Sequence, residues 1–212
     1  MLFWSSVLEL LRVALFALAH VCGGSLGGGI LLLSFIVRLA LLPLTLRLAI
    51  RAHEYQVIVK RLKPRLDALQ SRHGANPARL ARETRELYAA NGIGMAPKGT
   101  FLGAVVQMPI GAGVYQTIAS IGRRAVRFLW VHDLSRPDAL VASIAAGLAG
   151  AAVMAGPSSP TSRLTAGLAA LSTFLIAWRL SAGVGLYWVA SNVVGVVQSA
   201  LVRRAARTGQ QA

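Results

Sequence analysis

The feature that most limits what this chain can fold into is an apolar run, Leu26 to Leu46, with an arginine near its centre. The run reads LGGGILLLSFIVRLALLPLTL and is long enough to cross a bilayer as a helix, because a helix satisfies its own backbone groups in lipid. Arg38 costs about 2.5–3.5 kcal/mol at such depth, which the surrounding Leu, Ile, Phe and Val offset at about 0.3–0.6 kcal/mol each. A charged residue at such a depth, despite its free-energy cost, indicates a functional site.

No carboxylate shares the apolar segments with Arg38. The chain has seven Asp and Glu residues, at positions 9, 54, 67, 83, 86, 133 and 138, and none lies in a stretch long enough to span a bilayer. A guanidinium stays charged, so we expect Arg38 to meet water, backbone carbonyls or a visiting anion.

Composition indicates a multi-pass membrane protein. Of the 212 residues 55% are hydrophobic, yet the formal net charge is +15. Apolar stretches joined by basic segments are typical of this class, because Lys and Arg gather at the cytoplasmic face and meet anionic lipid headgroups. We therefore expect anionic lipids as partners and no binding to DNA. The single cysteine, Cys22, excludes an internal disulfide.

Hydropathy predicts an all-α membrane protein with five transmembrane helices. Ahead of them, Trp4, Glu9 and Arg12 favour an amphipathic helix at the membrane interface over a weak additional span, and CGGSLGGG predicts a turn. The predicted spans are 27–47, 101–122, 139–156, 164–179 and 183–202. The predicted domains are the interfacial helix 1–25, the first span 26–47, a cytoplasmic helical hairpin 48–98, the remaining spans within 99–202 and a basic tail 203–212.

The third and fourth predicted spans are short for a bilayer. Sixteen residues reach about 24 Å, against a hydrocarbon core of about 30 Å. Two explanations stay open: Arg163 and Arg179 extend their side chains to the interface, or the spans thin the bilayer locally.

Segment 48–98 predicts a polar helical hairpin. Asn76 is the expected N-cap of its second arm, Asn91 and Gly92 end that arm, and Pro64 predicts a kink or a break in the first. The segment has too little apolar surface to form a core of its own. We therefore expect a mobile hairpin that docks other proteins. Its narrow apolar stripe is Leu62, Leu66 and Leu69 on the first arm and Leu80, Thr84, Leu87 and Tyr88 on the second.

Basic residues predict the orientation. Eleven Lys and Arg in 47–100, Arg163 and three arginines of the tail would share one side, which makes 15, while six arginines would lie on the other. Cytoplasmic segments carry the excess of Lys and Arg, so we expect the N-terminus outside and the C-terminus in the cytoplasm.

Polar residues recur at helical spacing inside three predicted spans. If their faces converge, they line a wet cavity between helices. The alternative is ordinary hydrogen bonding between helices, which suits Ser34, Thr45 and Ser191 taken singly, whereas Arg38 favours function. The faces are Ser34, Arg38 and Thr45; Gln107, Gly111 and Tyr115; and Trp188, Ser191, Gly195 and Gln198, with Tyr187 and Asn192 at the edge of the last.

Enzyme chemistry is not predicted. The histidines at 20, 53, 73 and 132 lie outside the spans, so neither a Ser/His pair nor a carboxylate relay can form within the membrane. The segment GMAPKGT at 94–100 is a poor phosphate loop, because its Lys precedes Gly and no strand leads into it. We expect no catalytic residue, no metal and no cofactor.

Four motifs resemble those of the YidC/Oxa-type membrane protein insertases. They are SFIVRLALLPLT at 34–45, QMPI at 107–110, W-x-x-D-L-S-x-P-D at 130–138 and GLYWVASN followed by Gln198, in the family's order. Arg38 falls at the position of the family's groove arginine. The tail stops soon after Arg207, so we do not expect the long basic extension that tethers the ribosome in some relatives.

The resemblance implies five helices around a hydrophilic groove that opens to the cytoplasm and to lipid, in a bacterial inner membrane. It implies an insertase and chaperone that captures nascent membrane proteins and releases them laterally without ATP. Candidate partners at 48–98 are a Sec-type translocon, the signal recognition particle receptor and the ribosome. Together with the polar faces, it makes the candidate substrate-binding residues Arg38, Ser34, Gln107, Tyr115, Tyr187, Trp188, Ser191 and Asn192.

Two other functions stay open from the residues alone. An anion transporter or channel would use Arg38 as its anion site, although no internal repeat is visible. An assembly factor would hold membrane proteins without inserting them.

Overall fold

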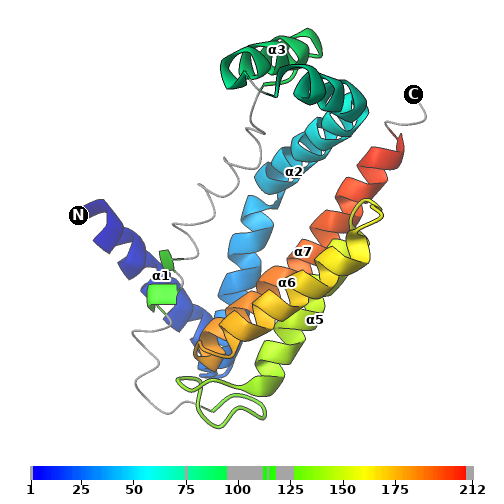
Figure 1. Ribbon diagram of the computed structural model, residues 1–212. Coiled ribbons are helices and arrows are strands. Elements are labelled where there is room, and N and C mark those ends of the chain that lie inside the picture. The colour runs from blue at the N-terminus through cyan, green and yellow to red at the C-terminus, as the bar shows by residue number, and fades with distance from the viewer. Residues whose placement is uncertain (1, 75, 95–111, 114, 118–126, 209–212) are drawn as a thin grey trace. The chain divides into compact units, whose positions relative to one another are not determined.

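The computed structural model describes residues 2–74, 76–94, 112–113, 115–117 and 127–208 (Figure 1). Within these ranges the chain is helical apart from its loops and one isolated bridge, so the all-α prediction is confirmed. Two compact units share the chain: residues 1–44 with 107–212, and residues 45–106. Of the predicted second span, only 112–113 and 115–117 are described, and they are helical.

The predicted glycine-rich turn joins α1 (Leu2–Val21) to α2 (Leu26–His73). Gly23 and Gly24 have φ values of 68° and 83°, the left-handed region that glycine adopts without strain. The Gly24 amide donates to the Ala19 carbonyl at 2.8 Å and ends α1. Ser25 Oγ then accepts from the Gly28 amide at 3.2 Å and caps the start of α2. The prediction of a turn here is confirmed.

The α2 helix runs without interruption through 48 residues. It contains the predicted first span and continues into the first arm of the predicted hairpin. Pro43 and Pro64 each remove one backbone donor, yet the helix continues past both, because the flanking hydrogen bonds of so long a helix remain in place. The prediction that the helix could break at Pro64 is therefore wrong.

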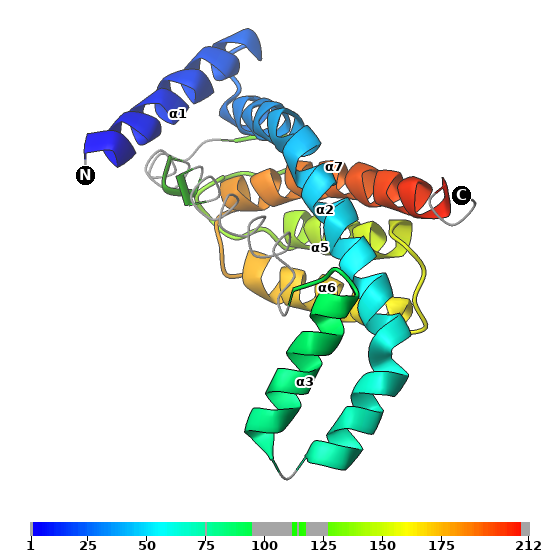
Figure 2. The same ribbon diagram turned by 90° about the horizontal axis from the view of Figure 1, so that it is seen from above.

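Three helices of the first unit pack side by side: α5 (Ala139–Ala155), α6 (Ser162–Ala177) and α7 (Ala182–Thr208), with α5 between the other two (Figure 2). Small residues line both contacts. A Cβ atom added at Gly150 would lie 3.3 Å from the Ala166 carbonyl oxygen of α6, and one at Gly185 of α7 would lie 2.6 Å from Val141 Cγ1. Glycine therefore permits the close approach of these helices.

Length and exposure suit a membrane for this set of helices. By length and composition, α2 and α7 can each cross a bilayer. The α5 and α6 helices have 17 and 16 residues, or about 26 and 24 Å. Their predicted shortness is confirmed. The outer face of α6 consists of leucines that are more than half exposed, which is expected where lipid replaces water: Leu164, Leu168, Leu171 and Leu175.

Among the described residues of the first unit, an apolar cluster joins several segments. It draws buried side chains from α1, the start of α2, the loop before α5, α5 itself and α7. Because segments far apart in the sequence meet there, the cluster joins the first turns of α2 to the first turns of α7. Its buried members are Leu15, Ile30, Leu33, Val131, Leu134, Val141, Ala182, Val184, Leu186 and Tyr187.

The second unit contains the last part of α2 and α3 (Pro77–Ala90). Asn76 Oδ1 accepts from the Arg79 amide at 3.1 Å, so the predicted N-cap is confirmed, as is the helix end at Asn91. His73 Nε2 lies 3.2 Å from Glu83 Oε2 and joins α2 to α3. Of the described residues in this unit only Leu48 and Leu62 are buried, which agrees with the expected lack of a core.

Candidate functional site

Arg38 lies on α2 in the middle of its apolar part, and its side chain is half-buried with the Nε atom fully covered. The guanidinium is close enough to Tyr187 of α7 to interact with it electrostatically. Both residues belong to the first unit. The structure therefore brings together two of the predicted site residues from helices distant in sequence.

Ser34 lies one helical turn before Arg38 but does not face an open space. Its side chain is 0% exposed, and Ser34 Oγ donates to the Ile30 carbonyl at 2.6 Å within α2. A hydroxyl bonded to its own helix in this way contributes to packing. Of the two interpretations of Ser34, this geometry favours the structural one.

Tyr187 and Ser191 lie one turn apart on α7, and both are buried. Among the described residues, Ser191 Oγ has no hydrogen-bond partner. Trp188, next to Tyr187, is half-buried. A buried hydroxyl without a partner is costly, so the Ser191 hydroxyl is a position that a water molecule or a polar group of a substrate can satisfy.

Asn192 makes a contact between helices. Its Nδ2 atom donates to the Ala145 carbonyl of α5 at 2.9 Å. The polar residues of the spans were expected either to line a cavity or to form hydrogen bonds between helices, and Asn192 forms such a hydrogen bond. Asn192 thus holds α7 against α5, whereas the hydroxyl of the neighbouring Ser191 makes no such bond among the described residues.

We expect Asn192→Ala to lower the stability of the chain by about 1 kcal/mol, because the hydrogen bond to α5 is lost. For a chain of this size that corresponds to a fall in melting temperature of about 2–4 °C in detergent. Ser172→Ala is the matched control, because Ser172 Oγ bonds only within α6, to the Ala169 carbonyl. Equal melting temperatures for the two variants would contradict this role.

The remaining candidates lie in or near the predicted second span. Gln107 is outside the described residues. Tyr115 is described and is 44% exposed. Thr117 is also buried, although it does not share the predicted face of 107, 111 and 115 and was not among the predicted site residues. Its only signal in the sequence was a hydroxyl within an apolar stretch.

The motif at 130–138 forms a loop that closes the starts of two helices. Asp138 Oδ1 accepts from the Val141 amide at 2.8 Å and caps α5. The Ala182 amide donates to the Arg136 carbonyl at 2.8 Å, and the Gly183 amide to the Leu134 carbonyl at 3.0 Å. The first amides of α7, which a helix leaves without partners, are satisfied by this loop.

Asp133 stabilises the same loop as a carboxylate. Its Oδ1 accepts from the Ser135 hydroxyl at 2.6 Å and from the Ser135 amide at 2.9 Å, and Arg136 Nε lies 3.4 Å from Oδ2. The hydrogen bonds from Ser135, more than the nearby guanidinium, hold the pKa of Asp133 below its ordinary value of 3.8.

This shift predicts how acid affects the loop. A carboxyl whose pKa is lower in the folded chain stabilises the fold above its unfolded pKa, and this contribution is lost as the pH falls through the folded pKa. Asp133→Asn keeps an acceptor but carries no charge. We expect the parent to melt above the variant at about pH 6, and the difference to shrink towards about pH 2.5. A difference independent of pH would contradict the assignment.

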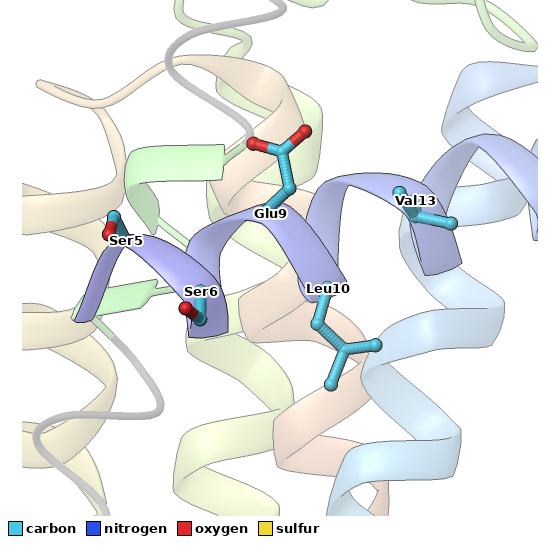
Figure 3. Close-up of a pocket in the computed structure, with 5 residues that line it drawn as sticks. All are labelled: Ser5, Ser6, Glu9, Leu10 and Val13. Atoms are coloured by element: carbon cyan, nitrogen blue, oxygen red, sulfur yellow. The ribbon is translucent and has the colours of Figure 1, made fainter. Parts of the chain in front are cut away.

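An open depression of about 520 Å³ lies along α1 and is lined by Ser5, Ser6, Glu9, Leu10 and Val13 (Figure 3). All five side chains come from one helix, and none of the candidate residues is among them, so we do not place the functional site there. Within the described ranges, no three His, Cys, Asp or Glu side chains come together as a metal site would require.

These features define a helical membrane protein with a half-buried cation between apolar helices. Residues 17–209 match the family described as 60Kd inner membrane protein, and the chain belongs to this family. The resemblance that the motifs predicted is confirmed.

Similar proteins in several bacteria carry the name membrane protein insertase YidC. The one from Clostridium tetani is 29% identical over 187 residues, which cover 85% of this chain and 82% of the relative. The one from Clostridium acetobutylicum is 29% identical over 84% of this chain and 73% of its own length. The one from Vibrio cholerae is 32% identical over 86% of this chain but only 34% of its own length, so this chain spans about a third of that relative.

Proposed function

We propose that this chain is a membrane protein insertase that works without ATP. In this mechanism Arg38 attracts the acidic or polar flank of a nascent membrane segment into a hydrated cavity between the helices. The apolar part of the segment then passes sideways into lipid. The names of the relatives and the family membership support insertion, and none of those names points to anion transport.

The observation that carries the proposal is the half-buried Arg38 guanidinium within an apolar helix, with Tyr187 of α7 within electrostatic range. A charge that is partly removed from water attracts an opposite charge more strongly than it would in bulk solvent. Ser191, one turn from Tyr187, supplies a buried hydroxyl for a further polar contact. We assign substrate contact to Arg38, Tyr187, Trp188 and Ser191, and we add Gln107 and Tyr115 from the sequence.

Release into lipid needs no other energy source. A substrate segment of about 20 apolar residues gains about 0.3–0.6 kcal/mol per residue, or about 6–12 kcal/mol, on entering the hydrocarbon. The short α5 and α6 helices would thin the bilayer beside the cavity and lower the barrier for the polar flank. The exit would lie between the first and fifth spans, α2 and α7.

We further propose that the chain lies in a bacterial inner membrane with its N-terminus outside and its C-terminus in the cytoplasm. The basic hairpin 48–98 would then face the cytoplasm, where anionic lipids, a Sec-type translocon, the signal recognition particle receptor and the ribosome are candidate partners. A cysteine at position 5, in a chain with Cys22→Ala, reports the side. Labelling by an impermeant reagent from the outer side of intact cells is expected, and labelling only after lysis would reverse the topology.

The proposal is tested with the purified chain in lipid vesicles that hold no translocon. A single-span substrate synthesised in their presence is expected to become protected from protease, and photo-crosslinkers at positions 107, 187 and 188 are expected to capture it. Empty vesicles give the background. If crosslinks form but no substrate becomes protected, the chain holds membrane proteins without inserting them. If neither occurs, the proposed function is wrong.

A further inference from the structure

A tight turn at residues 128–131 presents two large apolar side chains to the outside. The Phe128 amide donates to the Val131 carbonyl at 2.9 Å, and the Val131 amide donates back to the Phe128 carbonyl at 2.8 Å. Val131 is buried in the core, whereas Leu129 is 73% exposed and Trp130 is 44% exposed. The turn therefore has an inner side that packs on the protein and an apolar tip that does not.

The backbone of the tip is unusual for a bulky residue. Leu129 has a φ of 51° and is the only residue other than glycine with a positive φ in the described part of the chain. Residues with a large side chain rarely adopt this conformation. The backbone conformation of Leu129 costs free energy, and exposing the Leu129 and Trp130 side chains to water would cost more. This combination indicates that the tip of the turn lies in surroundings less polar than water.

The turn contacts the first turns of three helices. Phe128 packs against Gly27 in the first turn of α2, so closely that an added Cβ atom would overlap its ring. The following residues hold the first amides of α7 and, through Asp138, the first turn of α5. Figure 1 shows the starts of α2, α5 and α7 at one end of the first unit. Two of these helices are long and apolar enough to cross a bilayer, so the turn lies at the end where these helices begin.

Residues around the tip are those that a lipid boundary favours. Tryptophan is enriched at this level, because its ring prefers the headgroup region. Arg127 and His132 are exposed on the same loop and can face anionic headgroups. Both carboxylates of this loop are engaged within the protein: Asp133 by Ser135 and Arg136, and Asp138 by the Val141 amide.

We propose that this turn is a lipid anchor in which Leu129 and Trp130 insert at the boundary between headgroups and acyl chains, on the side of the membrane where α2, α5 and α7 begin. The anchor would keep the ends of three helices at a constant depth while a substrate moves past them. It does not depend on insertase activity, so either proposal can fail alone.

The anchor is tested by depth-dependent fluorescence quenching in dilute proteoliposomes of phosphatidylethanolamine and phosphatidylglycerol. An environment-sensitive fluorophore is placed on Leu129→Cys in a chain with Cys22→Ala, and on Arg136→Cys as the matched control in the same loop. We expect lipids with a nitroxide high on the acyl chain to quench the probe at position 129 at least threefold more than the probe at 136. Aqueous iodide is expected to show the opposite order.

Equal access of iodide to both probes would overturn the proposal, because the tip would then lie in water. Shielding from iodide without quenching by nitroxide lipids would overturn it as well, because protein would then cover the tip. The unlabelled chain gives a second measurement. Brominated lipids are expected to quench part of the tryptophan emission of the parent, and this part is expected to disappear in Trp130→Tyr. Unchanged quenching in Trp130→Tyr would also contradict the anchor.

Discussion

Replacing Arg38 with alanine is expected to reduce insertion of single-span substrates with acidic translocated tails about tenfold or more. A charge-assisted contact in a partly desolvated site contributes about 1.5–3 kcal/mol, and each 1.4 kcal/mol is a factor of about ten. Arg38→Lys is expected to keep much of the activity, because the positive charge remains and only the forked geometry of the guanidinium is lost. The measurement is protease protection of the substrate in vesicles containing the variant.

Loss of activity in Arg38→Ala cannot be ascribed to a span that fails to form. Removing the charge makes insertion of α2 itself more favourable by about 2.5–3.5 kcal/mol. Arg163→Ala is the matched control, because Arg163 is an exposed arginine in the first turn of another helix, α6. Its effect on insertion is expected to be small. If Arg38→Ala inserts acidic-tailed substrates as well as the parent, the capture step is wrong.

Gly29→Ala is expected to destabilise the chain, because the added methyl group would collide with the backbone of α1. A Cβ atom at position 29 would lie 2.9 Å from the backbone nitrogen of Ala19 and 3.0 Å from its Cα atom. A backbone cannot move aside as a side chain can, so α1 and α2 must separate. Overpacking of this kind costs about 1–3 kcal/mol, or a fall of about 2–12 °C in melting temperature for a chain of this size.

Gly167→Ala is the matched control for Gly29→Ala. Both glycines are helical, but an added Cβ atom at Gly167 of α6 meets nothing within 4 Å. Alanine in an open helical position is favoured over glycine by about 0.5–1 kcal/mol, so this variant is expected to melt at or above the parent. Melting temperatures that fall equally in both variants would show that the contact between α1 and α2 is not tight.

The candidate site could be predicted from the sequence in part. An arginine in a long apolar run stands out from composition alone, and the motifs around it led to the family. The proximity of Arg38 to Tyr187 could not be derived from spacing, because spacing places residues on a face of one helix and does not say which helix faces it. The same limit hid the bond from Asn192 to Ala145 and the burial of Thr117.

Local chemistry explains which parts of the fold were predictable. The glycines after Cys22 and the cap at Asn76 act through their nearest neighbours, so their roles can be read from a few residues. Whether the helix continues through Pro64 depends on the whole of α2, because a long helix tolerates one missing backbone donor. The loop at 130–138 was known only as a motif, since its backbone bonds join residues some fifty positions apart, such as Leu134 and Gly183.

The amino-acid order alone settles that this chain is helical and that its apolar runs belong in lipid with a cation among them, because solvation and backbone hydrogen bonding are properties of each segment. The folded arrangement decides which residue of another helix lies near Arg38, which serine is buried and which turn is exposed. Those outcomes depend on contacts between segments, and contacts are set by packing across the whole unit rather than by the composition of any one helix.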